Sequence, residues 1–145
     1  MQKTILLVED NPDDEELTLR ALKKNNIVNE VTVARDGQQA LDYFFGEKAA
    51  EKAAPSVVLL DLKLPKISGL DVLRRLRAEP RTSLQPIVIL TSSKEEQDII
   101  TGYRLGTNSY IRKPVDFDQF VEAIRQLGLY WLVLNEPVPG LHEKS

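Results

Sequence analysis

Acidic side chains follow two short apolar runs of this sequence. Residues 5–8 lead into Glu9 and Asp10, and residues 57–60 lead into Asp61. Three carboxylates brought close together repel one another, so at neutral pH they must take up a proton or bind a cation. Oxygen ligands with room for water suit Mg²⁺ or Mn²⁺. These residues therefore predict a site for a divalent cation.

A hydroxyl and an ammonium group follow two further segments. Residues 87–90 lead into Thr91, and a shorter segment ends at Lys113. A phosphoryl group needs both cation and lysine to neutralise its oxygens, whereas a site for a cation alone has no use for the lysine. Taken singly, Thr91 is explained as a helix cap, Lys113 as a surface cation, and each carboxylate as a solvated loop residue. Together they predict a site for a metal ion and a transferred phosphoryl group.

Alternating strands and helices must position these side chains. Short runs rich in β-branched residues are typical of buried parallel strands, and ligands of such sheets bind outside the carboxyl ends of the strands. Asn11 and Asp116 are suited to cap helices, and residues 46–56 indicate a surface loop or an extension of the second helix. The predicted strands are 3–8, 29–34, 57–61, 86–91 and 108–112, and the predicted helices are 12–25, 37–46, 69–78, 94–104 and 116–134. This order predicts an α/β fold with helices on both faces of a parallel sheet.

Length and composition narrow the class of protein. The 145 residues fit one domain over 1–134, followed by a tail, 135–145, that is too short for an output domain. Without cysteine the chain has no disulfides or thiolate metal sites, which fits a reducing cytoplasm. Its net charge of −3 argues against direct nucleic-acid binding. The apolar run at residues 5–8 is too short for the hydrophobic region of a signal peptide, and no apolar stretch approaches the roughly 18 residues of a membrane span, so we expect a soluble, cytoplasmic protein.

Several of these residues together resemble a known family. The matching positions are Glu9-Asp10, Asp61 with Leu64-Pro65 and Gly69 behind it, Thr91-Ser92, Tyr110, and Lys113-Pro114. This pattern resembles the receiver domain of bacterial response regulators, over about residues 3 to 134. The resemblance implies a doubly wound, flavodoxin-like fold whose five parallel strands lie in the order 2-1-3-4-5. It also implies a phosphoacceptor switch of a two-component system rather than a turnover enzyme.

The resemblance implies a role for each acidic residue. Asp61 would accept a phosphoryl group from a sensor histidine kinase as an acyl phosphate. Asp10 and Asp61 would bind Mg²⁺ or Mn²⁺ directly, Glu9 would act through water, and the backbone carbonyl of Lys63 would complete the protein ligands. Glutamate at position 9 is a departure, since aspartate is more frequent in the family. The Lys63 side chain lies near the pocket mouth, where it is either simply solvated or affects the rate of dephosphorylation.

The resemblance also implies how the domain changes conformation when it is phosphorylated. Thr91 and Lys113 would bind the phosphoryl oxygens, and Tyr110 would swing inward as Thr91 moves. The added negative charge would then bias a two-state face built by the fourth helix, the fifth strand and the fifth helix.

Two other classes share parts of this pattern. Aspartyl-phosphate phosphatases also carry a nucleophile after a strand, but their second aspartate falls where this chain has Lys63. Flavodoxins share the topology, but Glu9 and Asp10 would repel a flavin phosphate, and the absorbance of the purified protein distinguishes that class. Both alternatives stay open on the sequence alone.

The last predicted helix is more apolar than its place requires. One stripe is suited to face the core: Phe117, Phe120, Val121, Ile124, Leu127, Gly128 and Trp131. Leu129, Tyr130 and Val133 fall outside it and indicate an interface, unless a tail or loop covers them. Residues 11–14 and 130–137 resemble the small regulators paired with cyanobacterial phytochromes. That resemblance implies a phytochrome-type kinase as partner and a homodimer formed through the fourth helix, fifth strand and fifth helix.

We therefore expect the protein to elute as a dimer from a size-exclusion column at micromolar concentration. Burial of Leu129 and Val133 against a second copy supplies the driving force. The measurement is elution volume with light scattering, made with and without phosphorylation. Monomeric elution under both conditions would contradict the prediction.

Overall fold

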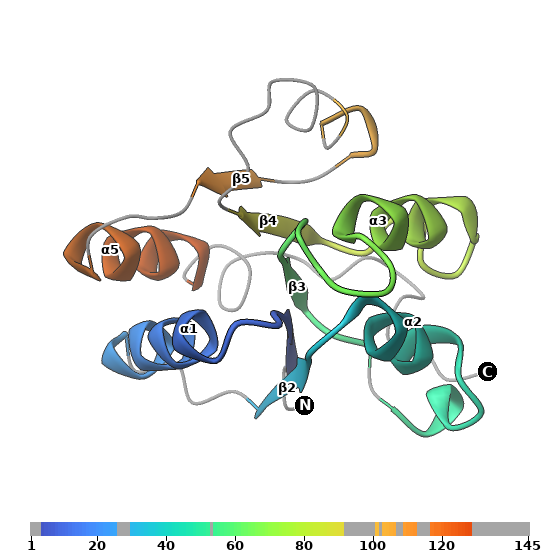
Figure 1. The fold of residues 1–145 in the computed structure, drawn as a ribbon, viewed down its shortest axis with the longest axis horizontal. Coiled ribbons are helices and arrows are strands. Elements are labelled where there is room, and N and C mark those ends of the chain that lie inside the picture. Colours follow the sequence, from blue (N-terminus) through green and yellow to red (C-terminus); the bar gives the residue numbers. More distant parts are fainter. Residues whose placement is uncertain are drawn as a thin grey trace.

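The computed structural model describes residues 4–25, 30–52, 54–91, 101, 103–106, 109–112 and 117–128. Within these ranges, five parallel strands form one sheet in the order β2-β1-β3-β4-β5 (Figure 1). The strands are β1 (Thr4–Val8), β2 (Glu30–Ala34), β3 (Val57–Leu60), β4 (Ile87–Thr91) and β5 (Ser109–Arg112). The predicted doubly wound fold and its strand order are confirmed.

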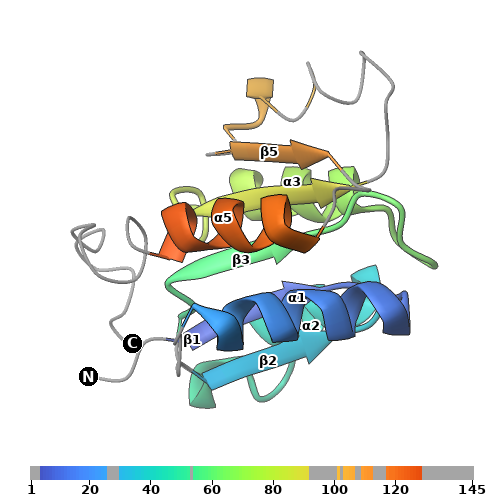
Figure 2. The ribbon, with the colours of Figure 1, turned by 90° about the vertical axis from the view of Figure 1, so that its left-hand side faces the viewer.

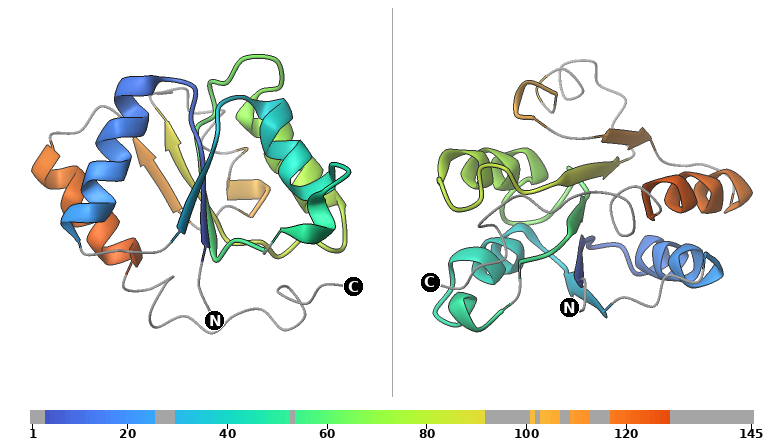
Figure 3. Two further views of the ribbon diagram at one scale, coloured as in Figure 1. Left: turned by 90° about the horizontal axis from the view of Figure 1, so that it is seen from below. Right: turned by 180° about the vertical axis from the view of Figure 1, so that it is seen from behind.

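Helices cover both faces of the sheet. They are α1 (Pro12–Lys24), α2 (Gly37–Phe45), α3 (Gly69–Ala78) and α5 (Phe117–Gly128), with a short 3₁₀ turn, η1 (Ala49–Glu51). Helices α1 and α5 lie on one face, and α2 and α3 lie on the other (Figures 2 and 3). Among the helices in the described ranges, none is both long and apolar enough to cross a bilayer.

The predicted spans agree closely with these elements. Each described strand or helix begins and ends within two residues of its predicted bounds, apart from the C-terminal end of α5. The predicted helix 94–104 and the end of the last predicted helix, 129–134, fall largely or wholly outside the described residues. The 3₁₀ turn η1 lies within residues 46–56, for which the sequence predicts a surface loop or an extension of the second helix.

Alternate side chains of the central strands pack into two separate hydrophobic layers. Leu6 and Val8 of β1 belong to the layer beneath α2 and α3, whereas Ile5 and Leu7 belong to the layer beneath α1. The side chains of residues 5–8 in β1 are at most 1 % exposed. Because both faces are covered, the four residues of β1 that follow Thr4 are all apolar instead of alternating with polar residues.

Side-chain caps fix where three helices begin. Asn11 accepts hydrogen bonds from the backbone N–H groups of Asp13 and Asp14, as its predicted capping role requires. Asp36 caps α2 and Ser68 caps α3 in the same way. Each cap satisfies N–H groups that have no partner within the helix. The loops after β1 and β3 are therefore held at both ends.

Gly69 lets helix α3 begin directly against the end of β3. Its backbone N–H donates to the carbonyl oxygen of Leu62 at 2.9 Å. A Cβ atom at this position would lie 2.1 Å from the carbonyl oxygen of Asp61 and 2.5 Å from the Cα of Leu62. Both are backbone atoms, so they cannot rotate away.

We expect Gly69→Ala to lower the free energy of unfolding by about 3 kcal/mol, the upper end of the range for overpacking. Chemical denaturation followed by circular dichroism measures the change. The control is Ser68→Ala, which removes the neighbouring cap without adding an atom beside Asp61 and should cost about 1 kcal/mol. A loss in Gly69→Ala no larger than in the control would contradict the close approach.

Candidate functional site

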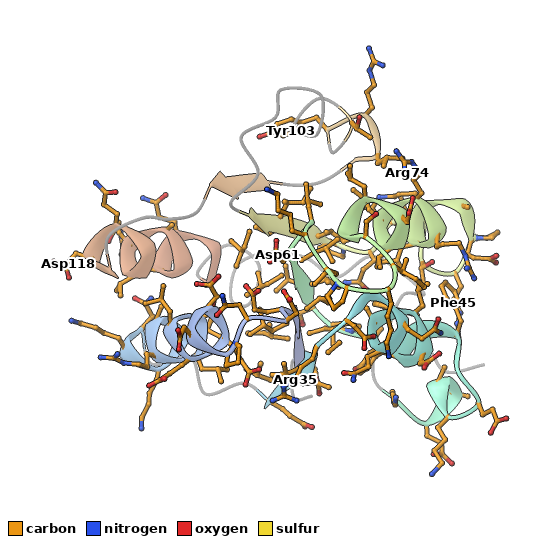
Figure 4. The ribbon with its side chains drawn as sticks, in the orientation of Figure 1. Arg35, Phe45, Asp61, Arg74, Tyr103 and Asp118 are labelled. Carbon is orange, nitrogen blue, oxygen red and sulfur yellow. The ribbon has the colours of Figure 1, made fainter. Side chains whose placement is uncertain are left out.

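The candidate site lies at the carboxyl ends of β1 and β3. Hydrogen bonds of the sheet continue past the last residue of each strand. The backbone N–H of Glu9 donates to the carbonyl oxygen of Ala34 at 2.9 Å, and that of Asp61 donates to the carbonyl oxygen of Val8 at 3.0 Å. Glu9 and Asp61 are thus fixed by the ladder itself. Figure 4 shows Asp61 near the centre of the molecule, while the other labelled side chains lie toward its periphery.

Three carboxylates meet at this point, as the sequence predicts. Glu9, Asp10 and Asp61 each offer an oxygen atom, and these atoms lie within 4.8 Å of one another. Glu9 is 2 % exposed and Asp61 is 7 % exposed, whereas Asp10 is open to solvent. Burial reduces the screening of repulsion between such groups. An all-oxygen set with one open side has the donor chemistry that Mg²⁺ and Mn²⁺ prefer.

Backbone groups hold the carboxylates in place. The N–H of Lys63 donates to Oδ1 of Asp61 at 3.2 Å, and the N–H of Asn11 donates to Oε2 of Glu9 at 3.3 Å. Lys63 itself is exposed on the loop that leaves β3. The loop thus turns back over Asp61, and Gly69 closes it against the end of the strand.

The register of the sheet places the other predicted residues at the same edge. Leu60 pairs with Ile89 and Thr91 pairs with Arg112, so Thr91 ends β4 beside the last residue of β5. Tyr110 lies on β5 opposite Ile89. The structure does not describe the side chains of Thr91 and Tyr110 or any part of Lys113. The approach of these three residues to Asp61 therefore stays a prediction.

Other predicted features also lie outside the described residues. The structure does not describe the predicted cap Asp116, the predicted interface residues Leu129, Tyr130 and Val133, or the tail 135–145. The domain boundary at 134 and the homodimer consequently stay predictions.

An ion pair beside the site was not predicted from the sequence. Oδ2 of Asp36 lies 3.3 Å from Nζ of Lys66, which belongs to the loop that carries Lys63. Lys66 has a φ of 68°, an uncommon conformation for a residue with a Cβ. Asp36 also accepts a hydrogen bond of 2.7 Å from the N–H of Gln39. The cap of α2 is thereby tied to the loop that follows Asp61.

Comparison with known proteins agrees with this geometry. Residues 5–125 match the model of the response regulator receiver domain, so the chain belongs to this family. It is 34 % identical over 131 residues to response regulator Rcp1 of Synechocystis sp., covering 90 % of this chain and 89 % of that protein. The Mn²⁺-bound structure of Rcp1 superimposes with a TM-score of 0.84 at 33 % identity, covering 94 % of this chain and 99 % of that one.

Two further solved structures are similar over nearly the whole chain. Bacteriophytochrome response regulator RtBRR is 55 % identical with a TM-score of 0.76, covering 97 % of this chain and 86 % of that one. The phosphorylated cyanobacterial phytochrome response regulator RcpA is 36 % identical with a TM-score of 0.84, covering 94 % and 98 %. The predicted likeness to phytochrome-associated regulators is confirmed.

The pKa of Asp36 is lowered from its ordinary value of 3.8, chiefly by the hydrogen bond from the Gln39 N–H and then by Lys66. A carboxylate whose folded-state pKa is depressed stabilises the fold above its unfolded pKa, and this contribution is lost as the pH falls through the folded value. We expect Asp36→Asn, which keeps a capping side chain, to be less stable than the wild type at neutral pH. The difference should vanish well below pH 3.8.

Urea denaturation at the two pH values measures this difference. Lys66→Gln is the matched control, and it should reproduce only the smaller share of the loss that comes from the ion pair. An equal deficit of Asp36→Asn at both pH values would contradict the assignment to the charged form of Asp36.

Proposed function

We propose that this chain is a phosphoacceptor switch of a two-component system, in which Asp61 accepts a phosphoryl group from a sensor histidine kinase. The observation that carries the proposal is the placement of Asp61, buried at a strand end within 4.8 Å of two further carboxylates. Membership of the receiver family supports the same role. The switch takes part in its own phosphorylation and dephosphorylation but turns over no separate substrate.

The donor set fits a bound Mg²⁺ or Mn²⁺. Asp10 and Asp61 would hold the ion directly, with the backbone carbonyl of Lys63, and Glu9 would act through a water molecule. Such an ion neutralises charge on the phosphoryl oxygens. The Mn²⁺-bound structure of the relative Rcp1 supports this assignment. Without a cation, the repulsion among Glu9, Asp10 and Asp61 would oppose the approach of a phosphoryl group.

Transfer to Asp61 exchanges one bond for another. A carboxylate oxygen of Asp61 attacks the phosphorus of a phosphohistidine on the kinase. A P–O bond forms, the P–N bond breaks, and the electron pair returns to the imidazole nitrogen of the donor. The hydrogen bond from the Lys63 N–H to Oδ1 holds the carboxylate in one orientation during this exchange.

In this proposal, three residues respond to the phosphoryl group on Asp61: Thr91, Lys113 and Tyr110. The Thr91 hydroxyl and the Lys113 ammonium bind the phosphoryl oxygens, and Tyr110 moves inward with Thr91. The position of Thr91 at the end of β4, beside the end of β5, supports this role. The acyl phosphate carries about −1.5 to −2 charges where the free carboxylate carried one, so the site gains about one negative charge and three strong acceptor oxygens that bias a two-state face.

A phytochrome-type kinase is the partner that we propose. The similarity to RtBRR at 55 % identity and to RcpA supports this class, because both are named as phytochrome response regulators. Leu129, Tyr130 and Val133 remain the proposed contacts of a homodimer. A cytoplasmic location without direct DNA binding is part of the same proposal, and the cysteine-free sequence and its net charge of −3 support it.

We expect Asp61→Asn to abolish phosphorylation by a kinase or by acetyl phosphate, because an amide oxygen is too weak a nucleophile to attack phosphorus. Intact-mass spectrometry of freshly labelled protein measures the phosphoryl group. Omission of Mg²⁺ should have the same effect on the wild type. The control is Asp71→Asn, an exposed carboxylate on α3, which should label normally. Stoichiometric labelling of Asp61→Asn would defeat the proposal.

A further inference from the structure

We propose that Arg77 is a positioning residue for the phosphoryl-binding half of the site, a role that rests on the function proposed above. Arg77 lies in the last turn of α3, near the point where β4 begins. The segment 103–106, which precedes β5, is hydrogen-bonded to this turn of the helix through Arg77. The guanidinium group bridges these two places.

Four main-chain carbonyl oxygens accept hydrogen bonds from Arg77. Nε donates to Leu105 at 2.7 Å, and Nη2 donates to Gly106 at 2.9 Å. Nη1 donates to Gln85 at 2.8 Å and to Ser83 at 3.1 Å. The acceptors belong to two segments, residues 83–85 and 105–106. One planar group therefore fixes the position of one segment relative to the other.

Both segments lead into strands that end at the site. Residues 83–85 precede β4, which ends at Thr91, and residues 105–106 precede β5, which Lys113 follows. None of the four acceptors belongs to β1 or β3, which carry the acidic cluster. Arg77 is thus connected to the proposed phosphoryl ligands rather than to the metal ligands.

The connection matters most for β5. In the described sheet β5 is an edge strand and pairs with β4 alone, so its ladder fixes it from one side. Gly106, just before β5, has a φ of 78°, which glycine adopts without strain. The carbonyl groups of this turn point at Arg77, which supplies an anchor from α3. The entry of β5 is consequently held by the guanidinium as well as by β4.

The chemistry of the anchor requires arginine. Burial lowers the pKa of Arg77, and four carbonyl dipoles offset part of the desolvation that causes this shift. Hydrogen bonds to a charged donor are stronger than neutral ones. Lysine carries a single nitrogen and cannot reach acceptors on two segments in the forked geometry of a guanidinium.

The test separates the two halves of the site in the full-length chain. Arg77→Met and Arg77→Lys are compared with the wild type for Mg²⁺ affinity and, at saturating Mg²⁺, for affinity toward beryllofluoride, a phosphoryl mimic. Amide hydrogen exchange of residues 101–112 is followed in parallel. Arg74→Met is the control, since Arg74 lies on the same helix, is 53 % exposed and pairs with Asp71 within one turn.

We expect Arg77→Met to weaken beryllofluoride binding about tenfold, the loss of roughly one charged hydrogen bond. Its Mg²⁺ affinity should stay within about twofold of the wild type, since Arg77 donates no hydrogen bond to β1 or β3, the strands that lead into the acidic residues. Exchange in 101–112 should accelerate, Arg77→Lys should be intermediate, and Arg74→Met should match the wild type. If Arg77→Met does not fold, Arg77→Lys provides the same comparison.

A parallel loss of Mg²⁺ and beryllofluoride affinity would overturn the proposal, because Arg77 would then stabilise the fold in general. Unchanged affinities and exchange in Arg77→Met would overturn it as well. The wild type separates this outcome from failure of the proposed function. If the wild type binds Mg²⁺ and beryllofluoride, the function stands whatever the Arg77 variants show, and if it binds neither, the function itself fails.

Discussion

Repulsion among three carboxylates is the constraint on which the rest of the structure depends. Glu9, Asp10 and Asp61 place oxygen atoms within 4.8 Å of one another, and two of these residues are buried. Such an arrangement opposes folding in the absence of a cation, so other parts of the chain must offset it. The same repulsion favours binding of a cation. The feature that strains the fold is therefore also the source of its affinity for metal.

The two strands that carry the acidic residues are suited to bear this strain. β1 and β3 occupy inner positions in the sheet, and their side chains are packed into layers on both faces. Each fully buried aliphatic side chain contributes about 1.5–3 kcal/mol. Ladder hydrogen bonds continue into Glu9 and Asp61 themselves. The carboxylates are thus attached to strands that are buried on both faces and paired with a neighbour on each side.

The strands, the helices and the acidic cluster could be predicted from the sequence because they depend on local patterns. Apolar runs mark the buried strands, Asn11 before Pro12 marks a helix start, and parallel topology brings strand ends together. The contacts of Asp36 with Lys66 and of Arg77 with Leu105 were not predictable in this way. They join segments distant in sequence, and neither lysine nor arginine in such a position differs locally from a solvated cation. Only the path of the loops selects their partners.

Position in the sheet gives the two halves of the site different mechanical properties. The acidic residues follow the inner strands β1 and β3, and Thr91 ends the inner strand β4, whereas Lys113 follows the edge strand β5. An edge strand has one ladder, so it opens or shifts at a lower free energy than an inner strand. A switch needs one part that binds its signal without moving and another that moves when the signal is bound. Under the proposed function, the cation and Asp61 belong to the first part and β5 to the second. Arg77 then matters because it limits the motion of β5 at its start, so that a displacement caused by the phosphoryl group is concentrated at the end of the strand that adjoins Lys113.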